Sequence, residues 1–256
     1  MSATGVGAVS FLARMAFSSI AILSLAGCAG GLPDVHSISS IAPSFGSSDS
    51  AEKPKAGGPV NLADLIQPGT LDDIAIGKAN APVTIVQYVS LNCATCGKFQ
   101  SATLPKLKKA YIDKGKVRLV FREFPEDNAS MTAALAVRCV GEKDYLKTME
   151  KLLSHQKEWT GPEANKDALY KLVKSGGLKR DKFDACLADK AVSDGLTAAK
   201  ERATGFGVTV SPTFFVNDKK VAGAVSAEEM QGVIDVAFAA TQAPAAAAQP
   251  QTKPKA

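Results

Sequence analysis

Histidine is scarce in this sequence, and several patterns that mark common functions are missing. Only 2 of its 256 residues are histidine, which leaves little material for histidine-based metal binding or acid–base catalysis. A mean hydropathy of +0.03 excludes a membrane protein with many spans. The net charge of +5 is spread thinly along the chain, so it does not predict a nucleic-acid partner. With 46% apolar and 21% charged residues, global disorder is excluded.

The N-terminal region has the pattern of a bacterial export signal. One basic residue, Arg14, precedes the apolar stretch Met15–Leu25, whose 11 residues are too few for the ~20 that span a bilayer as a helix. The next residues have the order of a bacterial lipobox, Leu25-Ala26-Gly27-Cys28. We expect a lipoprotein signal peptide over 1–27 and lipidation of Cys28. The alternatives are an ordinary signal peptide with a chance cysteine, or an uncleaved anchor.

Composition predicts one folded unit between two unstructured segments. Residues 28–60 are rich in glycine, serine and proline and poor in large apolar side chains, as in a flexible tether. Residues 241–256 form a tail of alanine, glutamine, proline and lysine, which we also expect to be disordered. The folded unit then covers residues 61–240, which is long enough for a sizeable hydrophobic core.

Within this unit, the hydrophobic period alternates between that of strands and that of helices. We expect strands at 83–90, 117–124, 210–216 and 221–223, with a turn at 217–220. We expect helices after Cys96, kinked at Pro105, and at about 129–140, 143–156, 165–175, 180–189, 191–204 and 227–239. This order predicts an α/β fold with a helical insertion at about 126–205.

Cys93 and Cys96 form a CxxC motif between a predicted strand and a predicted helix. Half a zinc site would need two further ligands nearby, whereas Cys139 and Cys186 lie singly, so we expect no metal. A purely structural disulfide in so small a ring would be strained and would stabilise the fold little. A redox pair is favoured because the N-terminus of a helix stabilises the Cys93 thiolate, leaving Cys96 to resolve a mixed disulfide.

Three segments together resemble the DsbA family of thioredoxin-fold thiol:disulfide oxidoreductases, whose fold carries an inserted helical domain. The resemblance covers about residues 70–240 and rests on residues 81–88 with the CxxC, 120–125 and 211–217. It implies that Pro212 is a cis-proline packed beside the CxxC, where sequence alone would favour a trans proline. It also implies that the Ser211 backbone receives an extended substrate segment by strand addition.

This sequence departs from the strongly oxidising members of the family at the residues around the cysteines. Ala94 and Thr95 stand where those members have Pro-His, so no imidazole supports the Cys93 thiolate, although the Thr95 hydroxyl can donate a hydrogen bond. Ser211 also differs from some members. The helix terminus and hydrogen bonds then predict a Cys93 pKa of roughly 5–7 and an intermediate redox potential.

Cys139 and Cys186 are a second candidate pair. Export to an oxidising compartment, and an even cysteine count once Cys28 is lipidated, favour a structural disulfide between them. Some DsbA relatives resemble this sequence in both segments. The alternative is two unpaired buried cysteines that act as small hydrophobic residues.

The sequence therefore predicts a periplasmic oxidoreductase that is anchored to a membrane through lipid on Cys28. We expect it to oxidise exported proteins with free thiols as a monomer, without a cofactor, and to be regenerated by a membrane redox partner. A disulfide reductase or isomerase of the same fold is one alternative. A non-redox chaperone or binding module, which would use the apolar groove around Pro212, is another.

Overall fold

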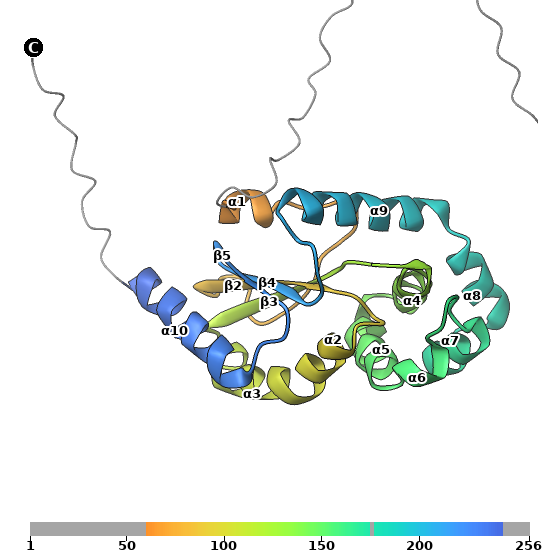
Figure 1. The fold of residues 1–256 in the computed structure, drawn as a ribbon, viewed down its shortest axis with the longest axis horizontal. Helices are drawn as coiled ribbons and strands as arrows, with labels where there is room; N and C mark the ends of the chain where they lie inside the picture. Colours follow the sequence, from red (N-terminus) through yellow and green to blue (C-terminus); the bar gives the residue numbers. More distant parts are fainter. Residues whose placement is uncertain (1–59, 175–176, 243–256) are drawn as a thin grey trace, which may run out of the picture. The chain divides into compact units, whose positions relative to one another are not determined.

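A mixed five-stranded sheet with helices on both faces forms the centre of the computed structural model, which describes residues 60–174 and 177–242 (Figure 1). The strands are β1 (Ile74–Ile76), β2 (Val83–Val89), β3 (Val117–Glu123), β4 (Thr213–Val216) and β5 (Lys219–Ala222), in the order β1-β3-β2-β4-β5. β2 and β3 are parallel, and the other pairs are antiparallel. The predicted signal peptide, all but the last residue of the tether, and the tail beyond residue 242 lie outside the described residues.

The central strand β2 is buried on both faces because its apolar side chains alternate between two cores. Val83, Ile85 and Val89 face the larger core, which includes the helices that follow the CxxC and the C-terminal helix α10 (Ala227–Gln242). Val86 and Tyr88 face the smaller core on the other side of the sheet. Burial on both faces explains why this strand is an almost continuous apolar run in the sequence.

The helical segment after the CxxC changes its hydrogen-bond pattern along its length. It comprises α2 (Ala94–Lys98), the π-helical η1 (Phe99–Thr103), α3 (Leu104–Leu107) and the π-helical η2 (Lys108–Ile112). Pro105, where we predicted a kink, lies in the first turn of α3. Because proline has no N–H, it cannot bond to the helical turn of η1 that precedes it, and the hydrogen-bond pattern changes from π to α at this point. The π-helical segments were not predicted.

Among the described residues, six helices lie between β3 and β4 and form the helical insertion. They are α4 (Asn128–Arg138), α5 (Glu142–Ser154), α6 (Gln156–Trp159), α7 (Lys166–Val173), α8 (Arg180–Leu187) and α9 (Lys190–Gly205). Figure 1 shows α9 returning along the sheet, on the face opposite α2, α3 and α10. No helix within the described residues has both the length and the apolar character needed to cross a membrane.

Buried ion pairs tie the sheet to the segments that cover it. Glu123, at the end of β3 and only 2% exposed, accepts hydrogen bonds from the Arg138 guanidinium at 2.6 Å and the Tyr145 hydroxyl at 2.8 Å. These bonds join the sheet to α4 and α5. Arg122, near the end of β3, pairs at 2.7 Å with Asp73, the residue before β1. Both charges of each pair are compensated, as buried charges require.

The structure corrects several predicted element boundaries. β4 begins at Thr213 and not at residue 210, because Pro212 has no N–H for the strand ladder. β5 covers Lys219–Ala222, which shortens the expected turn to two residues, 217 and 218. Three short elements were not predicted: β1, α1 (Leu62–Leu65) and α6. With three or four residues each, they are too short to show a hydrophobic period.

Candidate active site

Cys93 and Cys96 lie where the central strand continues into α2. Cys93 is the N-cap of this helix, and its sulfur accepts a hydrogen bond from the backbone N–H of Cys96 at 3.1 Å. The Thr95 hydroxyl oxygen lies 3.1 Å from the same sulfur. Cys93 is partly exposed, whereas Cys96 is completely buried, and the two are not bridged to each other. A substrate thiol therefore has access to Cys93 and none to Cys96.

The two thiols have opposite pKa shifts. The side-chain hydrogen bond with Cys96 is the largest cause that lowers the pKa of Cys93 from 9.0 to about 6. The Thr95 hydroxyl and the Cys96 N–H lower this pKa further, while burial and the charge of Glu126 raise it. Burial raises the pKa of the Cys96 thiol far above its ordinary value. At neutral pH the pair thus comprises a partly exposed thiolate and a buried neutral thiol, and the Cys93 value lies within the range expected from the sequence.

The loop before β4 brings Ser211 and Pro212 next to the CxxC motif. β4 pairs with β2, with Thr213 opposite Tyr88, and this pairing bridges the long sequence separation. The Ser211–Pro212 peptide bond is cis. The Ser211 carbonyl oxygen lies 3.4 Å from the Cys93 sulfur. A polypeptide that pairs with this loop would therefore pass directly over the reactive sulfur.

Glu126 is a residue of the site that sequence reasoning missed. Its carboxylate accepts a hydrogen bond from the backbone N–H of Ser211 at 3.2 Å. Its charge also raises the pKa of both Cys93 and Cys96, although other causes dominate for each. Glu126 lies in the loop between β3 and α4, 85 residues before Ser211, so no local sequence pattern connects the two.

The helical insertion also supports the CxxC loop directly. The Gln156 side-chain amide donates hydrogen bonds to the carbonyl oxygens of Leu91 at 2.8 Å and Cys93 at 2.9 Å. On the other side of the loop, Asn92 donates a hydrogen bond at 2.5 Å to Asp127, which caps α4. Two helices of the insertion thus fix the backbone that presents Cys93. These polar contacts were not predicted either.

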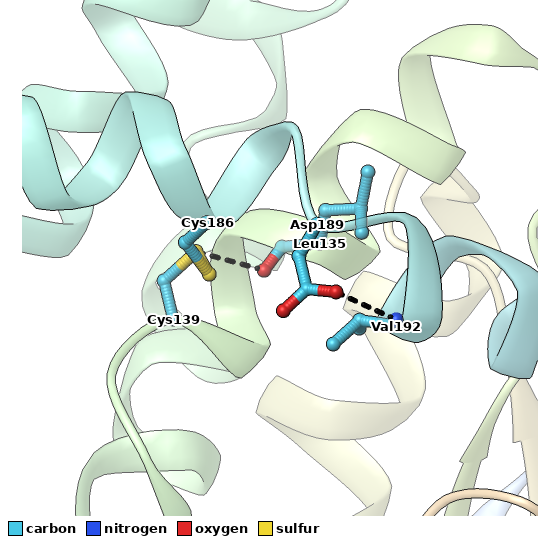
Figure 2. The surroundings of a disulfide bond; sticks show 5 residues. All are labelled: Leu135, Cys139, Cys186, Asp189 and Val192. Atoms are coloured by element: carbon cyan, nitrogen blue, oxygen red, sulfur yellow. Dashed lines mark hydrogen bonds between the residues drawn. A yellow bond between two sulfur atoms is a disulfide. The ribbon is translucent and has the colours of Figure 1, made fainter.

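Cys139 and Cys186 form a disulfide in the helical insertion, with a sulfur–sulfur distance of 2.09 Å and a Cα–Cα distance of 5.9 Å (Figure 2). Cys139 is the C-cap of α4, and Cys186 lies in the last turn of α8. Figure 2 also shows Asp189 just beyond α8, where it accepts a hydrogen bond from the Val192 N–H and caps α9. The disulfide therefore joins two helices within the insertion and lies apart from the CxxC motif in the chain.

The other predicted residues lie around the reactive sulfur or beyond the described residues. Ala94 is exposed and Thr95 partly exposed, whereas Pro212 is buried. Cys28 lies outside the described residues. No cluster of three or more potential metal ligands occurs in the described part of the chain.

Comparison with known proteins identifies the family to which this geometry belongs. A family model described as Thioredoxin matches residues 70–236. The crystal structure of Wolbachia pipientis alpha-DsbA1 is similar, with a TM-score of 0.64 and 28% identity over 71% of this chain and 98% of that chain. This similarity confirms the predicted thioredoxin fold with a helical insertion.

Two curated relatives have names that describe disulfide chemistry. A putative protein-disulfide oxidoreductase of Rickettsia bellii is 27% identical over 148 residues, which are 57% of this chain and 57% of that protein. Disulfide bond formation protein D of Bacillus subtilis is 27% identical over 177 residues, or 66% of this chain and 78% of that protein. The chain spans less than two thirds of the length of the Rickettsia relatives that it matches. The chain belongs to the thioredoxin family and, within that family, is similar to DsbA-type disulfide oxidoreductases.

Proposed function

We propose that this protein is a thiol:disulfide oxidase that transfers the Cys93–Cys96 disulfide to exported proteins with free thiols. The observation that carries the proposal is the asymmetry of the pair, because Cys93 is partly exposed with a lowered pKa and Cys96 is buried with a raised one. Stabilisation of the Cys93 thiolate favours the reduced pair, and a pair that favours its reduced form is an oxidant.

The reaction consists of two thiol–disulfide exchanges. A substrate thiolate attacks the Cys93 sulfur of the oxidised pair, the Cys93–Cys96 bond breaks, and Cys96 leaves with the electron pair and takes up a proton. A second substrate thiolate then attacks the substrate sulfur of the mixed disulfide. This step forms the substrate disulfide and releases Cys93 as a thiolate, which the Cys96 N–H and the Thr95 hydroxyl stabilise.

The cis Ser211–Pro212 loop supports a role in binding the substrate. The Ser211 carbonyl oxygen lies 3.4 Å from the Cys93 sulfur, so an extended segment that pairs with it would hold a substrate cysteine close to Cys93. Reoxidation of the pair requires an electron acceptor, for which we propose a membrane redox partner. The protein would act as a monomer and without a bound cofactor.

The direct test uses the oxidised protein with a reduced, unfolded substrate that contains two cysteines. The wild type should form the substrate disulfide in a stoichiometric burst, whereas Cys93→Ser and Cys96→Ser, which cannot form the disulfide of the pair, should both be inactive. With a substrate that already contains a disulfide, reduced Cys96→Ser should accumulate a mixed disulfide, because the Cys93 thiolate attacks the substrate disulfide, releases one substrate thiolate and has no Cys96 thiol to resolve the product. Alkylation of Cys93 should abolish the activity. A chaperone or binding module would keep its effect on the substrate after alkylation, while an isomerase would act mainly on substrates with scrambled disulfides.

We also propose that lipid on Cys28 anchors the protein at the periplasmic side of a membrane. The support is the lipobox order at residues 25–28 and the apolar stretch before it. A single lipidated cysteine adds membrane affinity in proportion to its acyl chains. Replacing Cys28 by Ser should move the protein from the membrane fraction to the soluble fraction. Equal retention of the variant in membranes would mean that the apolar stretch itself is the anchor.

A further inference from the structure

A groove of about 930 Å³ lies beside the reactive cysteine, between α2–η1 and α5. Its lining begins at Ala94, next to Cys93, and includes Gln156, whose side chain binds the Cys93 carbonyl oxygen. The two helices approach closely at Gly97, where a Cβ atom would lie 3.1 Å from the Leu153 carbonyl oxygen. Figure 1 shows α2 and α5 as neighbours at this end of the sheet. The groove is thus a continuation of the active site along the insertion.

The groove is lined by cations that lack ionic partners. Lys98 lines it from α2, and Lys147 and Lys151 line it from α5. Glu150 is the one residue with a carboxylate among those that line the groove in the described part of the chain. None of the three lysines forms an ion pair within the described residues. Lys147 and Lys151 are four residues apart on one helix, a spacing at which like charges repel each other. An anionic ligand in the groove would relieve this repulsion.

The remainder of the lining suits a polypeptide more than a small anion. Gln100, 4% exposed, is part of it and has a side-chain oxygen without a hydrogen-bond partner among the described residues. Ser101 and Ser154 add exposed hydroxyl groups, while Leu153 and Gly97 add apolar surface. The volume of the groove lies in the upper range for ligand pockets. A single phosphate or carboxylate group would leave most of this volume empty.

We propose that this groove binds an acidic segment of the substrate protein, close to the cysteine that reacts with Cys93. The inference deepens the proposed exchange function and depends on it. Charges at the rim of an interface act mainly on the association rate and its salt dependence. Lys98 and Lys147 lie on opposite walls and are both exposed, so a bound segment would contact both. Lys151 also donates a hydrogen bond at 2.8 Å to the Leu172 carbonyl oxygen and thus has a structural role.

The test compares two peptides that contain the same cysteine pair and differ only in the flanking residues. One peptide has aspartate and glutamate at these positions, and the other has asparagine and glutamine. Their oxidation rates are measured with the oxidised protein at subsaturating peptide. We expect the acidic peptide to react about three to ten times faster at low salt, and the ratio to approach one at high salt. The double variant Lys98→Gln/Lys147→Gln should lose most of this preference.

Two further variants decide the question even if Lys98→Gln/Lys147→Gln folds poorly or exchanges disulfides more slowly. Lys98→Glu/Lys147→Glu should reverse the preference, so that a peptide with flanking lysines reacts faster than the acidic one. Lys109→Gln/Lys114→Gln removes two exposed lysines that do not line the groove and should keep the wild-type ratio. Equal rates for the two peptides, or equal ratios in wild type and Lys98→Gln/Lys147→Gln, would overturn the groove proposal. If neither peptide were oxidised, the exchange function itself would fail.

Discussion

The backbone N–H of Cys96 donates a hydrogen bond at 3.1 Å to the sulfur of Cys93, so the reactive sulfur itself caps α2. A side-chain oxygen usually fills this position. Here the capping atom gains a negative charge when Cys93 ionises, and the unpaired N–H groups of the first helical turn favour that charge. The same contact therefore contributes to the stability of the helix and to the reactivity of the thiol.

Titration of the reduced protein should reveal one acidic thiol. The thiolate absorbance in the ultraviolet should rise with a midpoint at about pH 6, the pKa of Cys93, with no second step from Cys96 near neutral pH. Thr95→Val should raise the midpoint because it removes a hydroxyl hydrogen bond that lowers this pKa. Cys93→Ser should abolish the step. Persistence of the step in Cys93→Ser would assign the acidic thiol to Cys96.

Glu126→Gln should lower the pKa of Cys93 further and make the pair more oxidising. The carboxylate of Glu126 raises that pKa by its charge, which an amide lacks. The amide oxygen of the substituted side chain can still accept the hydrogen bond from the Ser211 N–H, so the loop geometry should be retained. Thiolate titration of the variant beside the wild type measures the effect. A raised or unchanged midpoint would show that the Glu126 charge does not act on Cys93.

The stability of the reduced protein should depend on pH between 6 and 9. The folded-state pKa of Cys93, about 6, is lower than the ordinary 9.0. Its contribution is therefore fully present above pH 9 and is lost as the pH falls toward 6. We expect the free energy of unfolding of reduced wild type, minus that of Cys93→Ser, to increase with pH over this window. Urea denaturation at several pH values gives the difference, and a flat or falling difference would contradict the Cys93 pKa.

Removal of the second disulfide should destabilise the protein without involving the CxxC pair. Cys139 and Cys186 are separated by 47 positions, and closing a loop of that length stabilises the folded state by about 4 kcal/mol in the chain-entropy model. Urea denaturation of Cys139→Ala/Cys186→Ala should show a loss of that order. A loss below about 1 kcal/mol would mean that the insertion has little need of this cross-link.

Local patterns in the sequence predicted the elements that carry the cysteines. The β-branched run that becomes β2, and the cysteine pair directly after it, needed no long-range information. The cis bond before Pro212 was expected only through the family resemblance, because most proline peptide bonds are trans. The hydrogen bonds of Glu126 to Ser211 and of Gln156 to Leu91 join residues 85 and 65 positions apart, and such contacts depend on the whole fold.

The burial of Gln87 in β2 also depends on the whole fold. Gln87 is fully buried, and neither polar atom of its side chain has a partner among the described residues. In the sequence, it is one polar residue within a strand of apolar ones, a pattern that usually indicates a solvent-facing side. Its cross-strand neighbours Phe121 and Phe214 belong to the larger core, so Gln87 faces that core as well. Only the pairing of three strands shows this burial.

The redox potential of the Cys93–Cys96 pair distinguishes an oxidase from a reductase. It can be measured by equilibrating the protein with glutathione buffers and separating the oxidised from the reduced form after acid quenching. We predict a potential between roughly −120 and −270 mV, because the helix terminus and Thr95 stabilise the thiolate without help from an imidazole. A potential more negative than roughly −270 mV would contradict the oxidase assignment and indicate a reductase.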